Sequence, residues 1–198
     1  MYRNVFKPLT DFLGAVLLLP LVLLVVLVFG PIIWLTDRGP IFYNAPRTGL
    51  HCRQFKMFKL RSMYVNAPDL RNTDGSTYNA DDDPRVTPIG RFLRKTSIDE
   101  LPQLLNVLLG QMSFVGPRPT LGRDDISFNH LEGDFQQRFT VKPGITGYAQ
   151  AYFRNSIPQE QKFHWDAYYA DHVGLLLDAK ILLRTVFAVV REKNINNA

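Results

Sequence analysis

Residues 12 to 35 form an almost uninterrupted apolar run, FLGAVLLLPLVLLVVLVFGPIIWL, which limits what this chain can fold into. About 20 apolar residues are enough for a helix to cross a bilayer. A buried helix of a soluble protein is rarely apolar on every face. A signal peptide has a shorter apolar region, about 7 to 15 residues, followed by a small-residue cleavage site that is missing here. We therefore predict a membrane helix.

The topology of this helix is not decided by its residues. Pro20 lies inside the run, and a proline within a helix removes a backbone hydrogen bond and kinks the helix. Basic residues flank both ends, Arg3 and Lys7 before the run and Arg38 after it, so the positive-inside tendency does not separate the ends. Two topologies stay open: a kinked re-entrant helix that enters and leaves by one face, and a single span with a tolerated proline.

The rest of the 198-residue chain is ordinary in polarity and suits one folded domain. The net charge of +5 favours a negative partner: a nucleic acid, anionic lipid head groups or a phosphorylated substrate. No nucleic-acid recognition motif is present, and the membrane segment opposes that interpretation. Cys52 is the single cysteine, so an intramolecular disulfide is excluded. We divide the chain into a membrane segment, 1–36, and a catalytic domain, 37–198, and predict an α+β fold, mainly helical with a small sheet.

Two stretches after the membrane segment are expected to be extended. Ile41–Tyr43 reads as a short strand, followed by a turn at Arg47–Gly49. Gln54–Met63 reads as a longer strand with a basic face that includes Lys59 and Arg61. That face either contacts phosphate or lipid head groups or is a solvated surface.

Three consecutive aspartates, residues 81 to 83, lie in the polar stretch that follows. Carboxylates are metal ligands, but successive residues of a loop rarely converge on one ion. We predict a solvated turn here.

Asp99 and Glu100 form an acid pair among basic residues in the stretch from 91 to 120. A helix capped by Thr96 or Ser97 would place both acids in its first turn, where the helix dipole favours them. Leucines at helical spacing follow, so Asp99 is expected to point away from the buried face, onto open ground. The acid pair is either capping chemistry or a site for a metal and a phosphorylated substrate.

Cationic residues near the acid pair favour the second interpretation. Arg94 precedes the acids, and Arg118 follows within Pro117–Pro119. The two prolines restrict the backbone on both sides of Arg118, which holds its guanidinium at low entropic cost.

The motifs around the acid pair resemble a known family. KTSIDELPQLLNVLLGQMSFVGPRP, from Lys95 to Pro119, is similar to the signature of bacterial sugar transferases that act on polyprenyl phosphate, the monotopic phosphoglycosyl transferases. The resemblance extends over nearly the whole chain, through four further segments: FKPLTDF, GPIFYNAPRTG, VKPGITGYAQ and FHWDAYYADHVGLLLDAKILLRT. One position departs from the family, which often breaks its membrane helix at Ser-Pro; here Leu19 precedes Pro20.

The resemblance implies a reaction and roles for the acids. Asp99 would attack the β-phosphate of a UDP-sugar, release UMP and carry a covalent phosphosugar, which polyprenyl (undecaprenyl) phosphate then takes up. Asp99 and Glu100 would hold Mg²⁺, a cation that shares its oxygen ligands with substrate phosphates.

Arg94 and Arg118 fall on arginines of the family motif and are expected to bind substrate phosphate. Lys59 and Arg61, on the basic face described above, are further candidates. Arg154 either contacts the diphosphate or uridine or is an unpaired surface arginine.

The resemblance also implies a location and partners. The catalytic domain would face the cytoplasm from a re-entrant helix in the bacterial inner membrane, at the first membrane step of a surface glycan pathway. Leu175–Val190 is expected to be an amphipathic helix in the head-group plane, with a core-packed helix as the alternative. A non-catalytic membrane-anchored scaffold is the alternative function. The sugar and the oligomeric state, a homo-oligomer included, are left open.

Overall fold

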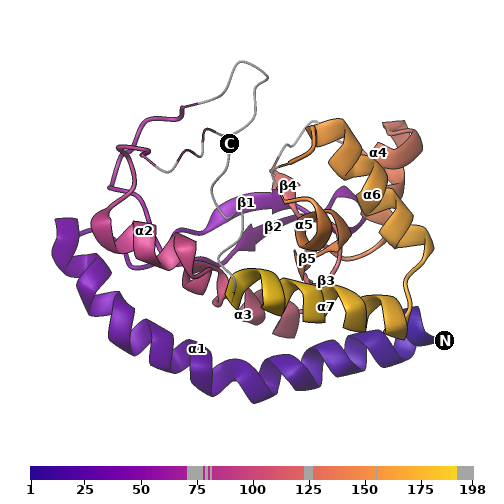
Figure 1. The fold of residues 1–198 in the computed structure, drawn as a ribbon, viewed down its shortest axis with the longest axis horizontal. Helices are drawn as coiled ribbons and strands as arrows, with labels where there is room; N and C mark the ends of the chain where they lie inside the picture. The colour runs from indigo at the N-terminus through magenta and orange to yellow at the C-terminus, as the bar shows by residue number, and fades with distance from the viewer. Residues whose placement is uncertain (71–77, 79, 81, 123–126, 155, 191–198) are drawn as a thin grey trace.

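A computed structural model of the chain describes residues 1–70, 78, 80, 82–122, 127–154 and 156–190. Figure 1 shows short helices and two small sheets gathered on the inner side of one long bent helix, α1. The described helices are α1 Lys7–Asp37, α2 Pro88–Lys95, α3 Gln103–Leu108, α4 Gly133–Gln137, α5 Tyr148–Tyr152, α6 Gln159–Asp171 and α7 Leu175–Val190. The strands are β1 Ala45–Thr48, β2 Gln54–Met57, β3 Ser113–Val115, β4 Thr120–Leu121 and β5 Gly144–Thr146. The prediction of a mainly helical α+β fold with a small sheet is confirmed.

The strands form two small sheets. One has the order β2-β1-β4, with both pairs antiparallel, and the other pairs β3 with β5 in parallel. Glycines allow the second pairing to be close. A Cβ on Gly144 would lie 2.1 Å from the backbone N of Gly116, and one on Gly147 would lie 2.2 Å from the Gly116 carbonyl oxygen. The glycines of the VKPGITG segment therefore bring β5 against the backbone that leads into Pro117–Pro119.

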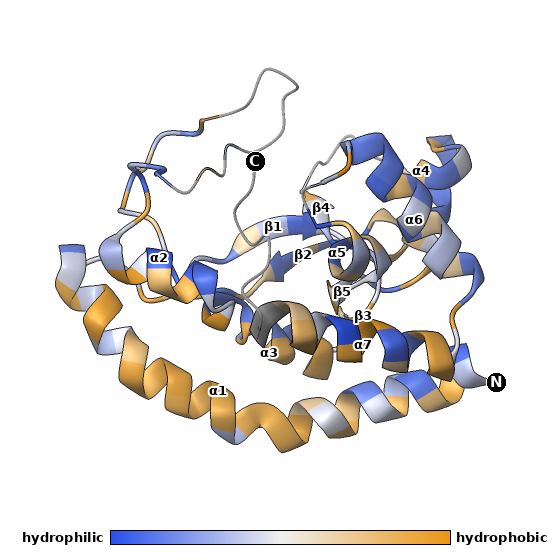
Figure 2. Cartoon of the chain, viewed as in Figure 1, coloured by the Kyte–Doolittle hydropathy of each residue, from blue (hydrophilic) through white to orange (hydrophobic). Residues whose placement is uncertain are grey.

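Helix α1 continues through Pro20 and Pro31, and it bends beneath the rest of the chain (Figure 1). Its most apolar 18-residue window is only 17% buried, so it is not the core helix of a soluble protein. Figure 2 shows that the helix is hydrophobic over most of its length. Among the described residues it is the one helix long and apolar enough to cross a membrane.

The inner side of α1 carries the core. Ala15 and Val22 pack with Leu104 and Val107 of α3, and Val25 and Ile33 pack with two further buried leucines, Leu60 and Leu93. A third cluster joins β3 to α6 and α7 around Tyr169 and Ile181. The acid pair therefore lies in a segment whose neighbours rest directly on α1.

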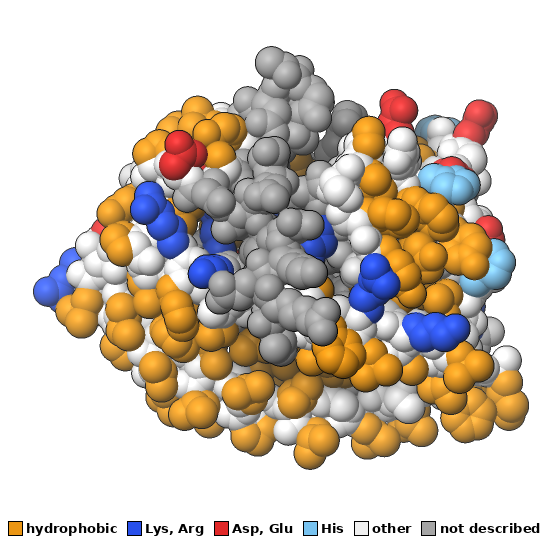
Figure 3. All heavy atoms as spheres, viewed as in Figure 1, with side chains coloured by type: hydrophobic (Ala, Val, Ile, Leu, Met, Phe, Trp, Pro, Cys, Tyr) orange, Lys and Arg blue, Asp and Glu red, His pale blue; other side chains and the backbone are white. Residues whose placement is uncertain are grey.

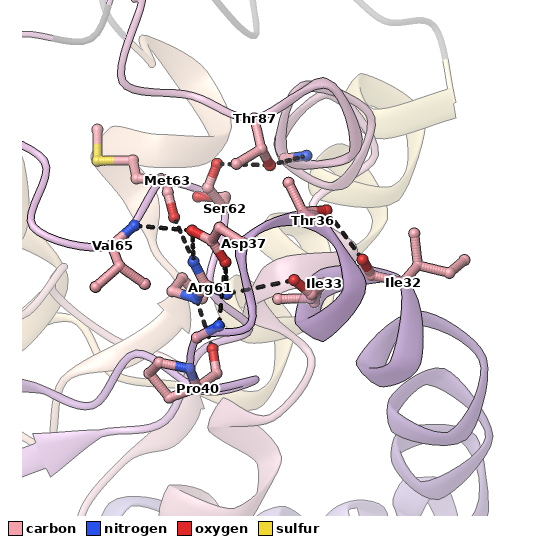
Figure 4. A network of polar contacts seen from close by, with 12 residues as sticks. Ile32, Ile33, Thr36, Asp37, Pro40, Arg61, Ser62, Met63, Val65 and Thr87 are labelled. Atoms are coloured by element: carbon pink, nitrogen blue, oxygen red, sulfur yellow. Dashed lines mark hydrogen bonds and ion pairs between the residues drawn. The ribbon is translucent and has the colours of Figure 1, made fainter.

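The C-terminal end of α1 is fixed by Arg61 (Figure 4). The Arg61 guanidinium donates to both carboxylate oxygens of Asp37 at 2.6 Å. It also donates to the carbonyls of Ile33, Pro40 and Met63, so all of its nitrogens are used. Arg61 is 5% exposed, which makes this a buried clamp between α1 and the segment after β2.

The N-terminal end of α1 is fixed by Asp178 of α7. One Asp178 oxygen accepts from Lys7 Nζ and from the Tyr2 hydroxyl, both at 2.7 Å. Its other oxygen accepts from the Tyr169 hydroxyl at 2.7 Å. Arg3 adds a hydrogen bond to the carbonyl of Thr140. Both ends of the bent helix are therefore attached to the same domain.

Helix α7 has one face packed on the core and one exposed apolar face, so it has features of both alternatives that the sequence left open for Leu175–Val190. Asp178 and Ile181 are buried against the domain. Its opposite face exposes apolar side chains at Leu175, Leu176, Leu182, Leu183, Val186 and Phe187. Figure 3 shows hydrophobic side chains gathered along the edge of the molecule that α1 and α7 form.

The predicted strand boundaries are wrong. Ile41–Tyr43 contributes only an isolated bridge, between Phe42 and Leu60, and β1 begins at Ala45. The turn comes later than predicted, because Gly49 and a 3-10 turn, Leu50–Cys52, connect β1 to β2. The second strand ends at Met57, where Phe58 N instead donates to the side chain of a buried asparagine, Asn106.

The predicted solvated aspartate turn is also wrong at Asp83. Its side chain is fully buried and receives hydrogen bonds from Arg85 at 2.7 to 3.2 Å. Asp82 is exposed, and Asp81 lies outside the described residues. A charged partner two residues along the chain makes this burial possible.

Arg61→Met should destabilise the fold strongly, because it leaves the Asp37 carboxylate without its partner. Breaking a buried ion pair by removing one member costs about 3–5 kcal/mol. The free energy of unfolding by urea in detergent micelles measures this. Arg53→Met, at an exposed arginine, should change it by less than about 0.5 kcal/mol. Equal losses in the two variants would contradict the clamp.

Candidate active site

The acid pair lies in a 3-10 turn, Ile98–Glu100, between α2 and α3. Ser97 has a left-handed backbone (φ 58°) and no side-chain capping bond, and Pro102 stands at the N-cap of α3. Ser97 stands at the N-cap and both acids lie in the first turn, as predicted, but the turn is 3-10 and lacks the predicted capping bond. The left-handed residue and the proline divide the segment into a turn and a six-residue helix.

Asp99 points into the protein. Its residue is 2% exposed, and its carbonyl accepts a hydrogen bond from Leu60 N at 3.0 Å. The expectation that Asp99 faces open ground is wrong, since helical spacing does not apply to a 3-10 turn followed by proline. The nearby Glu100 side chain is 20% exposed, so this half of the pair is accessible.

Lys59 joins the two acids. Its Nζ lies 3.0 Å from Asp99 Oδ2 and 3.1 Å from Glu100 Oε1. The sequence predicted Lys59 near a phosphate site, and the structure places its ammonium between the two carboxylates. One cationic group therefore bridges both acids from the segment that follows β2.

Arg118 approaches from the other side. Its Nη2 donates to Glu100 Oε1 at 3.2 Å, and its side chain is 55% exposed. The backbone beneath it is held by Gly144 N, which donates to the Pro117 carbonyl at 2.9 Å. The rigid turn thus presents a partly exposed guanidinium at the acid pair, as its prolines predicted.

Arg94 and Arg154 occupy different surroundings. Arg94 Nε donates to Ser62 Oγ at 2.9 Å, and the charge of Asp99 acts on it. Burial lowers the pKa of Arg94, which places this guanidinium in a low-dielectric environment next to the acids. Arg154 follows α5 with a left-handed backbone (φ 50°), and within the part of the chain that the structure describes no hydrogen bond or ion pair joins it to the acid pair.

Arg61 is the predicted substrate contact that the structure assigns elsewhere. Its donors all go to α1 and to neighbouring carbonyls, with Asp37 as the partner (Figure 4). Strict alternation would put Lys59 and Arg61 on one face, but β2 ends at Met57 and the chain after it is irregular, so the two side chains diverge. The basic face predicted from spacing is therefore divided between the acid pair and the membrane helix.

The two acids have different electrostatics. Burial raises the pKa of Asp99, and the negative Glu100 adds to this, whereas Lys59 acts in the opposite direction. Burial also acts to raise the pKa of Glu100, but the charges of Lys59 and Arg118 outweigh it and lower that pKa to about 2. At Asp99, burial therefore outweighs the neighbouring positive charges. Glu100 is therefore ionised at neutral pH, beside an Asp99 whose pKa is raised.

The donor set fits Mg²⁺. Asp99 Oδ2 and Glu100 Oε1 already converge on one cationic atom, the Lys59 Nζ, and carboxylate oxygens are the ligands that Mg²⁺ prefers. Among the residues that the structure describes, no group of three or more His, Cys, Asp or Glu side chains could hold a metal ion. An ion held by these two acids would therefore take its other ligands from water and substrate phosphates.

Comparison with known proteins assigns the family. Residues 2–192 match the family described as bacterial sugar transferase. The match covers nearly the whole chain, including the acid pair, Lys59 and the Pro117–Pro119 turn. The chain belongs to the bacterial sugar transferase family.

Individual relatives agree with this. The chain is 41% identical over 192 residues to a Bacillus subtilis (strain 168) protein named uncharacterized sugar transferase EpsL, covering 96% of this chain and 90% of that protein. It is 38% identical over 197 residues to a UDP-glucose:undecaprenyl-phosphate glucose-1-phosphate transferase of Xanthomonas campestris pv. campestris, covering 97% of this chain and 40% of the relative. It is 46% identical over 148 residues to an undecaprenyl-phosphate glucose phosphotransferase of Komagataeibacter xylinus, covering 71% and 26%. The chain thus spans less than half the length of the last two.

Sequence reasoning missed several residues that shape the site. Arg138 and Asp166 form a buried ion pair, with Arg138 donating to the carbonyl of Arg118. Asp37 and Asp178 fix the two ends of α1. The partner of each of these residues lies far away in the sequence, so only the fold shows what it contacts.

Lys59→Met should raise the pKa of Asp99 further, because it removes the ammonium that stabilises the ionised carboxylate. Carboxyl ¹³C chemical shifts during a pH titration in detergent micelles measure this pKa. Lys56→Met, at an exposed lysine of β2, should leave it in place. A midpoint for Asp99 that stays put or falls in Lys59→Met would contradict the bridge.

Proposed function

We propose that this protein transfers a sugar 1-phosphate from a UDP-sugar to polyprenyl phosphate at the cytoplasmic face of a bacterial inner membrane. The observation that carries the proposal is the acid pair, with buried Asp99 and ionised Glu100 bridged by Lys59 and contacted by Arg118. The names of the Xanthomonas and Komagataeibacter relatives support the same reaction. It would be the first membrane step of a surface glycan pathway.

In the first step Asp99 acts as the nucleophile. A carboxylate oxygen attacks the β-phosphorus of the UDP-sugar and forms an O–P bond. The bond between the β-phosphorus and the oxygen bridging to the α-phosphorus breaks, and UMP leaves with the electron pair. The raised pKa of Asp99 suits this role, since a more basic carboxylate is a better nucleophile once ionised.

In the second step the acceptor completes the transfer. An oxygen of polyprenyl phosphate attacks the phosphorus held on Asp99, which forms the polyprenyl diphosphate sugar and returns the carboxylate. Lys59 keeps Asp99 oriented and offsets its charge, and Arg118 presents its exposed guanidinium to the diphosphate. Arg94 adds positive charge from the side of Ser62.

Mg²⁺ would be held by Asp99 and Glu100 together with substrate oxygens. When bound, it neutralises phosphate charge and so lets an anionic nucleophile approach. The low pKa of Glu100 supports this assignment, because the carboxylate stays ionised at any physiological pH.

The re-entrant topology is part of the proposal. A straight 31-residue helix would be about 46 Å long, more than the roughly 30 Å of the hydrocarbon core. The clamps at Asp37 and Lys7 attach both of its ends to one polar domain, which supports entry and exit by the same face. The exposed apolar face of α7 would lie in the head-group plane beside it.

The acid pair would then sit at the height of the lipid phosphates. Ile98 and Leu101, which flank the acids, pack against the core cluster to which Val25 and Ile33 of α1 belong. A site one side-chain layer above the inserted helix can receive a phosphate whose lipid tail stays in the bilayer. A non-catalytic scaffold has no need of the bridged acids.

Asp99→Asn should lower UMP release by more than about 1,000-fold, because an amide is not a nucleophile for phosphorus. A panel of UDP-sugars that includes UDP-glucose and UDP-galactose, with polyprenyl phosphate and Mg²⁺, provides the assay. The exposed Asp134→Asn serves as the matched control and should retain full activity. Equal UMP release by wild type and Asp99→Asn would rule out the covalent mechanism, and no release by wild type with any sugar would rule out the function.

A further inference from the structure

We propose that Arg138, anchored by Asp166, is a positioning residue that holds Arg118 in place against the acid pair. The inference rests on the proposed function, since its effect is exerted on the same site. Arg138 begins the 3-10 turn Arg138–Thr140, far along the chain from the acids, and is 3% exposed.

The contacts of Arg138 connect α6 to the Pro117–Pro119 turn. Its Nη2 donates to the carbonyl of Arg118 at 2.6 Å. Nη2 and Nε also donate to Asp166 Oδ2 of α6, at 2.8 and 3.2 Å. Asp166 is itself 3% exposed, so the ion pair is shielded from water. The guanidinium thus ties a buried carboxylate to the backbone of the residue whose side chain meets Glu100.

Aromatic rings restrict the guanidinium further. Its Cζ lies 4.7 Å from the ring centroid of Phe163, 5.1 Å from that of Phe139 and 6.0 Å from that of Phe135. Cation–π contacts of this kind favour one plane of the guanidinium. The Arg138 guanidinium is therefore fixed by an ion pair, by hydrogen bonds and by aromatic packing, and not only by its hydrogen bond to the Arg118 carbonyl.

The turn is pinned at two successive carbonyls. Gly144 N holds the Pro117 carbonyl at 2.9 Å, and Arg138 holds the Arg118 carbonyl. With both peptides fixed, the flexible part of Arg118 is its side chain alone, which reaches Glu100 at 3.2 Å. Loss of the Arg138 bond frees the second carbonyl, and a displacement of about 1 Å at a reacting centre can cost about 100-fold in rate.

A double-mutant cycle separates this role from general loss of structure. Arg138→Met is made in wild type and in Arg118→Met, and kcat/KM for UMP release is measured in all four proteins. The affinity for UDP with Mg²⁺ is measured by calorimetry in the same four proteins. This gives a second double-mutant cycle that does not depend on turnover. Arg85→Met is the matched control, because it removes an equally buried arginine from an ion pair with Asp83.

If Arg138 acts through Arg118, Arg138→Met lowers kcat/KM about 10- to 100-fold in wild type but less than about 2-fold once the Arg118 side chain is gone. Arg85→Met should have the same factor in both backgrounds. An equal factor for Arg138→Met in both backgrounds, or no effect in wild type, would overturn the inference. Absence of UMP release in wild type would instead be a failure of the proposed function.

Discussion

The attachment of both ends of α1 to one domain is the constraint on which the structure depends. Lys7 reaches Asp178 of α7 at one end, and Asp37 meets Arg61 at the other. Between them the helix is apolar and largely uncovered. In the proposed re-entrant topology, a hydrocarbon layer would surround its middle, and both ends would stay on the side of the polar domain to which they are attached. Helix α1, which contains Pro20 and Pro31, is bent (Figure 1) although Leu19 and not a serine precedes Pro20.

Four consecutive residues, 59 to 62, connect α1 to the acid pair and its neighbours. Lys59 bridges Asp99 and Glu100, Leu60 binds the Asp99 carbonyl through its backbone N–H, Arg61 clamps α1, and Ser62 holds Arg94. This stretch lies beyond the end of β2 at Met57, and its side chains and backbone reach both α1 and the acid pair. In the proposed topology, the position of the acid pair near the membrane surface would follow from the same contacts that attach α1 to the domain.

The sequence predicted the membrane helix, the mixed fold and the neighbourhood of the acids. Length and composition sufficed for the helix, and the two prolines around Arg118 indicated a fixed guanidinium. It did not predict that Asp99 is buried, because helical spacing was assumed across a left-handed Ser97 and a proline. The partners of Arg61, Asp178 and Arg138 could not be predicted, since each ion pair joins segments far apart in the chain.

The proposed re-entrant topology of α1 predicts that both of its ends lie on the same side of the membrane. Single cysteines at Asn4 and Asn44, both exposed, can be placed in a Cys52→Ala background and labelled with a membrane-impermeant maleimide. In intact cells neither cysteine should react, and in inverted membrane vesicles both should. Labelling of one position in cells and the other only in inverted vesicles would show that α1 spans the bilayer, and would contradict the account.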